Sequence, residues 1–146
     1  MTTYFDASAL LALLLNEPAA DAVDRFMQNH DQTVSISTLC IAECSAAISG
    51  LVRMKRRSEA DVSILLQRLD DWLDAFSDRA PILDADVEEA CALVRRLDLK
   101  LRTPDAIHIA VARRLNARLV TLDHPMAQAA GLLNMDCINP AEPSAT

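Results

Sequence analysis

The chain has 146 residues, of which 51% are hydrophobic and 24% charged, and this size and composition predict one globular domain with an apolar core. Its net charge of −7 argues against a protein that binds nucleic acid only by bulk electrostatic attraction. No apolar run reaches the roughly 20 residues that a membrane-spanning helix needs, and no basic and then apolar leader opens the chain. We therefore expect a cytoplasmic protein that does not associate with membranes.

Short extended segments alternate with helical patterns along the chain. The first half is predicted to contain, in order, a strand at Thr2–Phe5, helices at Ala7–Leu15 and Pro18–His30, a strand at Thr33–Ile36, and helices at Thr38–Met54 and Ser58–Ser77. The second half is predicted to contain a strand at Ala80–Leu83, helices at Ala85–Leu97 and Pro104–Leu115, a strand at Arg118–Leu122, a short helix from Pro125 and a strand at Met135–Ile138.

This alternation also predicts how the elements assemble. Strands that alternate with helices need crossover connections, which give a mainly parallel sheet with helices on both faces. We therefore predict a doubly wound α/β domain of about five strands over residues 1–138. Residues 139–146 contain two prolines and no hydrophobic periodicity, so we expect a flexible C-terminal tail there.

Four carboxylates each stand alone in a stretch that is otherwise free of charge. With histidine counted as neutral, these are Asp6 in residues 1–16, Glu43 in 32–52, Asp105 in 103–112 and Asp123 in 119–135. The remaining acidic residues lie in mixed stretches typical of a solvated surface. An ionised carboxylate in apolar surroundings is costly unless it is paired, protonated or bound to a metal ion, so four such positions in one domain suggest a common site.

The predicted elements place these acids where they can meet. Asp6 and Asp123 each follow a predicted strand, and the carboxyl ends of parallel strands meet at one edge of a sheet. Asp105 lies in a first helical turn behind Pro104, and Glu43 lies within a helix. A cluster of oxygen ligands of this kind suits Mg²⁺ or Mn²⁺ better than zinc.

Each acid also has a purely structural interpretation. Asp is a favoured N-cap residue, which would account for Asp6 or Asp123 alone, and the helix dipole favours an acid at the position of Asp105. Glu43 is the hardest to explain in this way, because no cationic residue lies within two helical turns of it. The structural interpretation therefore needs four separate coincidences.

Four segments carry a resemblance to a known family: Y-F-D-A-S-A-L-L, I-A-E-C-S, L-R-T-P-D-A-I-H-I-A and L-V-T-L-D-H-P. In their order and spacing they resemble the four acidic motifs of PIN-domain nucleases, and the chain length is similar to that of VapC-type toxins of toxin–antitoxin systems. The resemblance implies a catalytic metal site made of Asp6, Glu43, Asp105 and Asp123. It also implies that the hydroxyls of Ser8, Thr103 and Thr121 orient these carboxylates or a water molecule.

The same resemblance implies a Mg²⁺- or Mn²⁺-dependent endoribonuclease that acts as a toxin on RNA. It further implies a small antitoxin of the VapB type as partner, and a homodimer. An additional acid that sometimes follows the fourth motif is missing, since the chain reads H-P-M-A-Q there, so the number of metal ions stays open. Arg102, three residues before Asp105, is a candidate to contact a substrate phosphate.

Other interpretations are weaker. A phosphatase of the haloacid type would need a second Asp where the chain has Ser8, and a receiver domain would need an acidic pair on the first strand. The main alternative is a non-catalytic or stand-alone PIN-domain module that binds RNA without an antitoxin. His108, one helical turn after Asp105, is interpreted as a packed or surface histidine and is left out of the site. Most of the basic residues are interpreted as solvated helix ends.

Overall fold

The computed structural model describes residues 2–30 and 33–142. Its sheet has five strands in the order β3-β2-β1-β4-β5, and every neighbouring pair is parallel. The strands are β1 (Thr3–Phe5), β2 (Val34–Ser37), β3 (Ser77–Ala80), β4 (Arg118–Val120) and β5 (Cys137–Ile138). The predicted fold class is confirmed, and the order places β1 at the centre, between β2 and β4.

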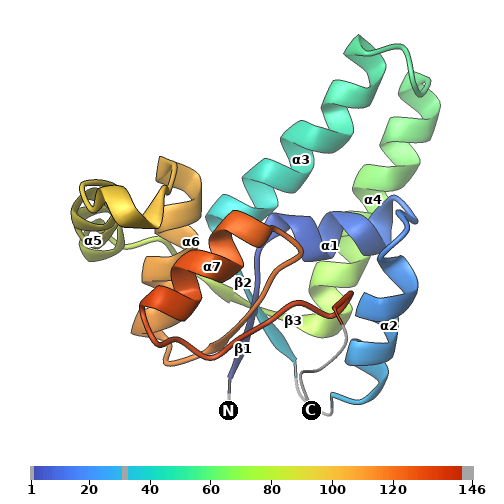
Figure 1. The fold of residues 1–146 in the computed structure, drawn as a ribbon. Coiled ribbons are helices and arrows are strands. Elements are labelled where there is room, and N and C mark those ends of the chain that lie inside the picture. Colours follow the sequence, from blue (N-terminus) through green and yellow to red (C-terminus); the bar gives the residue numbers. More distant parts are fainter. Residues whose placement is uncertain (1, 31–32, 143–146) are drawn as a thin grey trace.

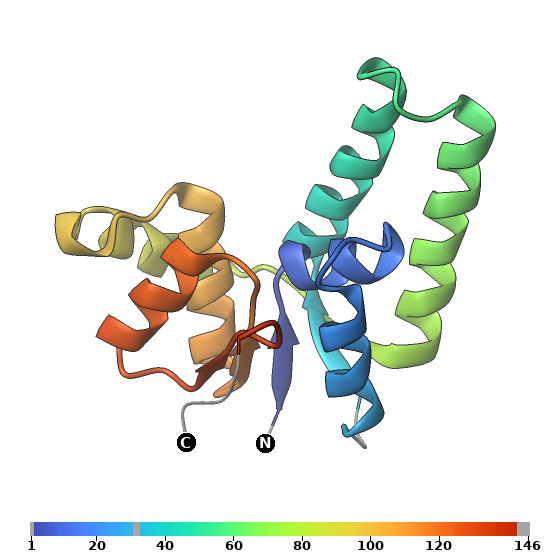
Figure 2. The same ribbon diagram turned by 45° about the vertical axis from the view of Figure 1, so that its right-hand side comes forward.

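Within the described residues, seven α-helices and one 3₁₀ turn connect the strands (Figures 1 and 2). They are α1 (Ala7–Leu14), α2 (Ala20–Gln28), α3 (Thr38–Arg53), α4 (Glu59–Phe76), α5 (Asp84–Val94), η1 (Leu97–Leu99), α6 (Thr103–Arg114) and α7 (His124–Leu132). Helices α3 and α4 form a hairpin whose tip projects away from the sheet, while α5, α6 and α7 lie together on the opposite side of the molecule.

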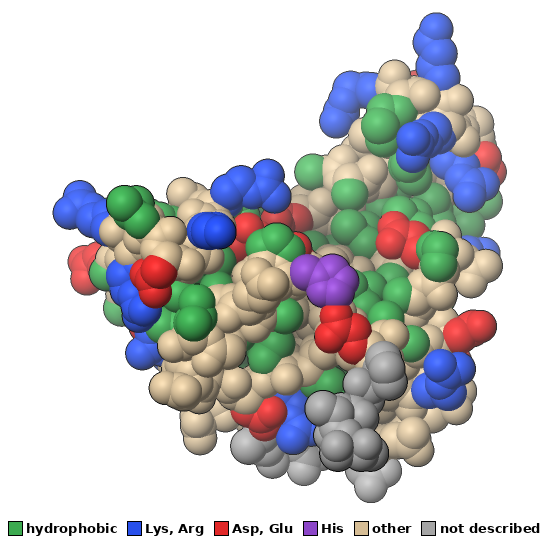
Figure 3. All heavy atoms as spheres, viewed as in Figure 1, with side chains coloured by type: hydrophobic (Ala, Val, Ile, Leu, Met, Phe, Trp, Pro, Cys, Tyr) green, Lys and Arg blue, Asp and Glu red, His purple; other side chains and the backbone are tan. Residues whose placement is uncertain are grey.

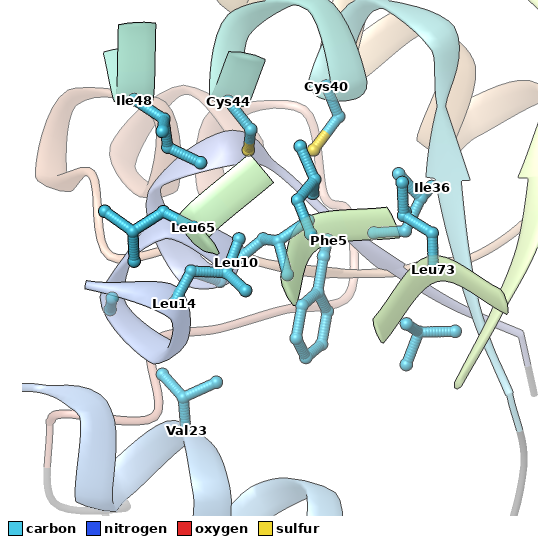
Figure 4. Close-up of a cluster of buried hydrophobic side chains, with 14 of the residues drawn as sticks. Phe5, Leu10, Leu14, Val23, Ile36, Cys40, Cys44, Ile48, Leu65 and Leu73 are labelled. Atoms are coloured by element: carbon cyan, nitrogen blue, oxygen red, sulfur yellow. The ribbon is translucent and has the colours of Figure 1, made fainter. Parts of the chain in front are cut away.

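The core has two parts, one on each face of the sheet, because successive strand side chains point to opposite faces. Phe5 and Val120 pack with α1, α2, α3 and α4 (Figure 4). Their neighbours Tyr4 and Leu119 pack with α5, α6 and α7. All three residues of β1 are buried, as expected for a central strand covered on both faces.

The third strand lies three residues earlier than predicted. We predicted it at Ala80–Leu83, but β3 spans Ser77–Ala80 and follows α4 directly. Pro81 explains where it ends, since proline has no N–H to donate to a sheet ladder. The start of the strand was misplaced because Ser77, Asp78 and Arg79 are polar and β3 is an edge strand, where half-exposed side chains are tolerated. Helix α5 also ends earlier than predicted, at Val94.

The described part of the C-terminal tail, residues 139–142, reaches back to α7. Oε1 of Glu142 lies 2.9 Å from Nδ1 of His124, and Asn139 accepts a hydrogen bond from the backbone N–H of Ala141. The remainder of the tail that we predicted to be flexible, residues 143–146, lies outside the described residues. Within residues 2–30 and 33–142, no helix combines the length and the apolar character needed to cross a membrane.

Candidate active site

Asp6 lies at the carboxyl end of β1, where the strand passes into α1. Its side chain is only 2% exposed. Oδ1 accepts hydrogen bonds from Oγ of Ser8 at 2.6 Å and from the backbone N–H of Ala9 at 3.2 Å, so Asp6 is the N-cap of α1. Burial raises the pKa of Asp6, and the hydrogen bonds from Ser8 and Thr121 oppose that rise. Asp6 is therefore both a helix cap and a buried acid, so the two interpretations of it are compatible.

Thr121, which follows β4, connects two of the predicted acids. Its Oγ1 donates to Oδ2 of Asp6 at 2.5 Å and accepts a hydrogen bond from the backbone N–H of Asp123 at 3.0 Å. The hydroxyl of Ser8 accepts a hydrogen bond from the backbone N–H of Leu122 at 2.9 Å. These contacts exist because β1 and β4 are adjacent and parallel, which brings their carboxyl ends together.

Asp105 and Asp123 lie at the N-terminal ends of α6 and α7. Asp123 occupies the N-cap position of α7, but its side chain makes no capping hydrogen bond. Burial and the negative charge of Asp123 raise the pKa of Asp105, while Arg102 and His108 oppose the rise. Arg102 is 89% exposed, and its Nε lies 3.8 Å from Oδ2 of Asp105. The negative charge of Asp123 therefore disfavours ionisation of Asp105.

Glu43, on α3, contacts a histidine that sequence reasoning left out of the site. Its Oε1 meets Nε2 of His108, which projects from α6 and is 2% exposed. The sequence analysis found no cationic residue near Glu43 because it compared only residues on the same helix. The partner of Glu43 is contributed by another helix, α6. A signal for His108 was available, since it lies three residues after Asp105 and therefore on the same helical face.

The four predicted acids line one hollow at the edge of the sheet. Ser8 and His108 line it as well, together with Ala7 and Met126. Figure 3 shows acidic side chains gathered beside the base of the α3–α4 hairpin, with basic side chains near them. Thr103, which we expected to orient a carboxylate, is exposed, and its hydroxyl makes no hydrogen bond to a described residue. The structure thus brings together all the predicted acids and two of the three hydroxyls.

The acids do not converge as a finished set of ligands. In the part of the chain that the structure describes, no three His, Cys, Asp or Glu side chains are close enough to hold one ion. The reason lies in their present partners, because both oxygens of Asp6 accept hydrogen bonds and Oε1 of Glu43 faces His108. The donor set still fits a hard cation, since all four candidate ligands are carboxylates that line the same hollow.

The fold and this hollow define a class of small α/β domains that gather carboxylates at the carboxyl edge of a parallel sheet. The model of the PIN domain matches residues 3–132, and the chain belongs to the PIN domain family. It is 35% identical over 141 residues to Ribonuclease VapC46 of Mycobacterium tuberculosis, a match that covers 94% of this chain and 97% of the relative. Within the family, the chain is therefore of the VapC type.

Solved structures agree with the fold. FitAcB from Neisseria gonorrhoeae has a TM-score of 0.76 at 14% identity, over 95% of this chain and 98% of that one. VapBC2 from Rickettsia felis, solved with a DNA fragment from its promoter, has a TM-score of 0.73 at 17% identity, over 95% of this chain and 98% of that one. At these identities the likeness concerns the fold.

Proposed function

We propose that this protein is a Mg²⁺- or Mn²⁺-dependent endoribonuclease and the toxin of a VapBC-like toxin–antitoxin pair. The observation that carries the proposal is the single hollow lined by Asp6, Glu43, Asp105 and Asp123. The relative named as a ribonuclease, which matches nearly the whole chain, supports the same activity. The intact set of acids favours a nuclease over a PIN-domain module that binds RNA without cutting it.

The carboxylates are the residues that would hold the ion. A bound Mg²⁺ or Mn²⁺ would supply a Lewis acid for the scissile phosphate and a water of lowered pKa as nucleophile. Ser8 and Thr121 donate hydrogen bonds that hold Asp6 in place. The negative charge of Asp123 raises the pKa of Asp105. No cysteine lines the hollow, and the hydroxyl of its serine, Ser8, donates to Asp6. This arrangement favours direct attack by water over a covalent enzyme intermediate.

A cationic side chain beside the acids, that of Arg102, supports RNA as the substrate. Arg102 lies at the start of α6 and extends into solvent beside Asp105. A phosphate contact by such an arginine positions a nucleic acid without reading its sequence. Because the chain as a whole is acidic, we infer that substrate binding depends on a few local cations and on the metal ion that neutralises the hollow.

A second, larger hollow, the apolar groove, is a candidate binding site for the antitoxin. It encloses about 640 Å³ between α1, α2 and α4, and apolar side chains dominate its lining, among them Leu13, Leu14, Met27, Trp72 and Phe76. A groove of this kind fits the apolar face of a partner helix. One fold neighbour is described as a toxin–antitoxin complex from Klebsiella pneumoniae, with a TM-score of 0.68 at 20% identity over 97% of this chain and all of that one. We also propose that the chain forms a homodimer.

Cleavage assays with purified protein free of any partner test the activity. A panel of structured RNAs should be cut in Mn²⁺ and left intact in EDTA, and the products should carry 5′-phosphate and 3′-hydroxyl ends. Asp6→Asn and Asp105→Asn should remove cleavage while the circular dichroism spectrum stays unchanged. Asp70→Asn, at an exposed position on α4, is the control. Full activity of either site variant, or activity in EDTA, overturns the proposal, and RNA binding without cleavage in Mn²⁺ favours the non-catalytic module.

A further inference from the structure

A chain of four hydrogen-bonded side chains ends at Glu43. Nε2 of His108 contacts Oε1 of Glu43, and Nδ1 of His108 lies 2.6 Å from the hydroxyl of Tyr4. Tyr4 donates to Oγ of Ser37 at 2.8 Å, and Ser37 accepts a hydrogen bond from the backbone N–H of Cys40, which caps α3. Tyr4, Ser37 and His108 are all buried. The hydrogen-bond network therefore runs from the first turn of α3, by way of Tyr4 on β1 and His108 on α6, back to the Glu43 carboxylate on α3.

This arrangement connects the elements that carry three of the four acids. Tyr4 lies two residues before Asp6 on β1, and His108 lies one turn after Asp105 on α6. Ser37 ends β2 and begins α3, the helix of Glu43. Because β1, β2 and α6 meet at Tyr4 and His108, the position of the imidazole fixes Glu43 relative to Asp6 and Asp105.

The geometry determines what His108 does for Glu43. An ionised carboxylate can only accept hydrogen bonds, so Nε2 of His108 is the donor. The contact uses Oε1, which leaves Oε2 of Glu43 for a ligand in the hollow that both side chains line. On the other side of the ring, the hydroxyl oxygen of Tyr4, whose proton is donated to Ser37, accepts a hydrogen bond from Nδ1–H and so sets the orientation of the imidazole. Among the described residues, Glu43 has no ion pair with Lys or Arg, so the imidazole of His108 is the side chain that donates to it.

We propose that His108 is a positioning residue that orients Glu43 toward the metal ion and the scissile phosphate, with Tyr4 and Ser37 fixing the ring. This inference rests on the proposed metal-dependent function. Partners that orient a metal-ligating carboxylate typically contribute 10–100-fold to metal affinity or activity. The role differs from simple core packing, because it depends on a hydrogen-bond donor at the Nε2 position and not on the volume of the side chain.

The test measures Mn²⁺ binding separately from activity. For wild type, His108→Leu, His108→Gln and Tyr4→Phe, the melting temperature is followed as Mn²⁺ is titrated into metal-free protein. His108→Leu should raise the Mn²⁺ concentration at half-maximal stabilisation about tenfold or more. His108→Gln should restore much of this loss, because its amide N–H reaches near the position of Nε2. Tyr4→Phe should give a shift in the same direction that is smaller than that of His108→Leu, because it leaves the Nε2 donor in place.

Controls separate this inference from general destabilisation and from the proposed function itself. Ile109→Val alters a buried residue next to His108 on α6, and it should lower the melting temperature without moving the Mn²⁺ midpoint. If His108→Leu and Ile109→Val behave alike, or if His108→Gln and His108→Leu have the same midpoint, His108 only packs and the inference is overturned. If Asp6→Asn and Asp105→Asn also retain the wild-type midpoint, the proposed metal site itself is wrong.

Discussion

Thr121 donates a hydrogen bond to Oδ2 of Asp6 across the carboxyl ends of two neighbouring strands, although 115 residues separate the two in the chain. Thr121 is fully buried and Asp6 nearly so. The same hydroxyl accepts a hydrogen bond from the backbone N–H of Asp123. A single side chain thus holds one acid directly and places the backbone of a second, so the geometry of the hollow depends on it.

Thr121→Val should destabilise the protein and weaken cleavage, because the valine keeps the shape of threonine but cannot donate to Asp6. A hydrogen bond to a charged group contributes about 1.5–3 kcal/mol, and we expect a loss of that size in the free energy of unfolding, measured in urea. Thr38→Val, at an exposed position at the start of α3, should change it much less. Equal effects of the two substitutions would contradict a special role for Thr121.

Asp123→Asn should stabilise the metal-free protein. Asp123 makes no capping hydrogen bond with its side chain, and its charge disfavours ionisation of Asp105. Removing the charge should therefore raise the stability in EDTA by on the order of 1 kcal/mol, while the stabilisation that Mn²⁺ gives should shrink. Thermal melts with EDTA and with Mn²⁺ measure both. A variant that melts no higher than wild type in EDTA, and gains as much from Mn²⁺, would remove Asp123 from the site.

Buried Asp86 and partly exposed Arg114 form an ion pair that the sequence interpretation missed. We expected the acids outside the four candidates to be solvated, but Asp86 is buried and binds Arg114 at 2.8 and 3.0 Å. Arg114 also donates to the carbonyl oxygen of Pro81 at 2.9 Å, so the pair connects α5 to α6. The expectation of a solvated surface is therefore wrong for Asp86, because its partner is contributed by another helix.

The contribution of this pair should depend on pH in the acid range. Burial opposes ionisation of Asp86, but the hydrogen bonds from Arg114 and from the backbone N–H of Leu83 outweigh it, so the pKa lies below the ordinary 3.8. A lowered folded-state pKa means that the stabilisation is complete above 3.8 and is lost as the pH falls through the folded-state value. Asp86→Asn should cost about 1–2 kcal/mol at neutral pH, since solvent at the partly exposed Arg114 screens the pair, and this difference from wild type should shrink below pH 3.8.

Urea unfolding of wild type and Asp86→Asn at pH 7, pH 5 and progressively lower pH measures this difference. Asp98→Asn is the matched control, because Asp98 pairs with Arg96 at 2.9 Å on the surface, where solvent screens the interaction. It should change stability far less at every pH. A cost of Asp86→Asn that stays constant down to the lowest pH would show that the effect comes from packing and not from ionisation.

Phe76→Glu should block binding of the antitoxin without unfolding the protein. Phe76 is 48% exposed and lines the apolar groove between α1, α2 and α4. A helix bound in this groove would bury the new carboxylate away from water, which would lower the binding affinity. Ile64→Glu is the control, since Ile64 lies on the same helix, is 55% exposed and is outside that groove. Co-purification with a small antitoxin of the VapB type, together with thermal melts, tests both variants. Normal complex formation by Phe76→Glu would contradict the assignment of the groove.

The sequence alone was sufficient to predict the parallel α/β fold and to single out four acids that line one hollow in the structure. Hydrophobic periodicity is a local property, and it placed most helices and strands within a few residues of their bounds. The absence of charge around Asp6, Glu43, Asp105 and Asp123 is also a local property of the sequence. Where local signals were weak, as in the polar edge strand β3, the prediction was wrong by three residues.

The partners of those acids were decided only by the tertiary structure. Glu43 meets His108 because α3 and α6 pack against each other, and Asp6 meets Thr121 because β1 and β4 are adjacent. Asp86 is buried for the same kind of reason, since Arg114 approaches it from a neighbouring helix. A hydrogen bond needs its two heavy atoms to lie about 3 Å apart. For residues far apart in the chain, the packing of the elements fixes that distance. The spacing of residues along one element does not encode this packing.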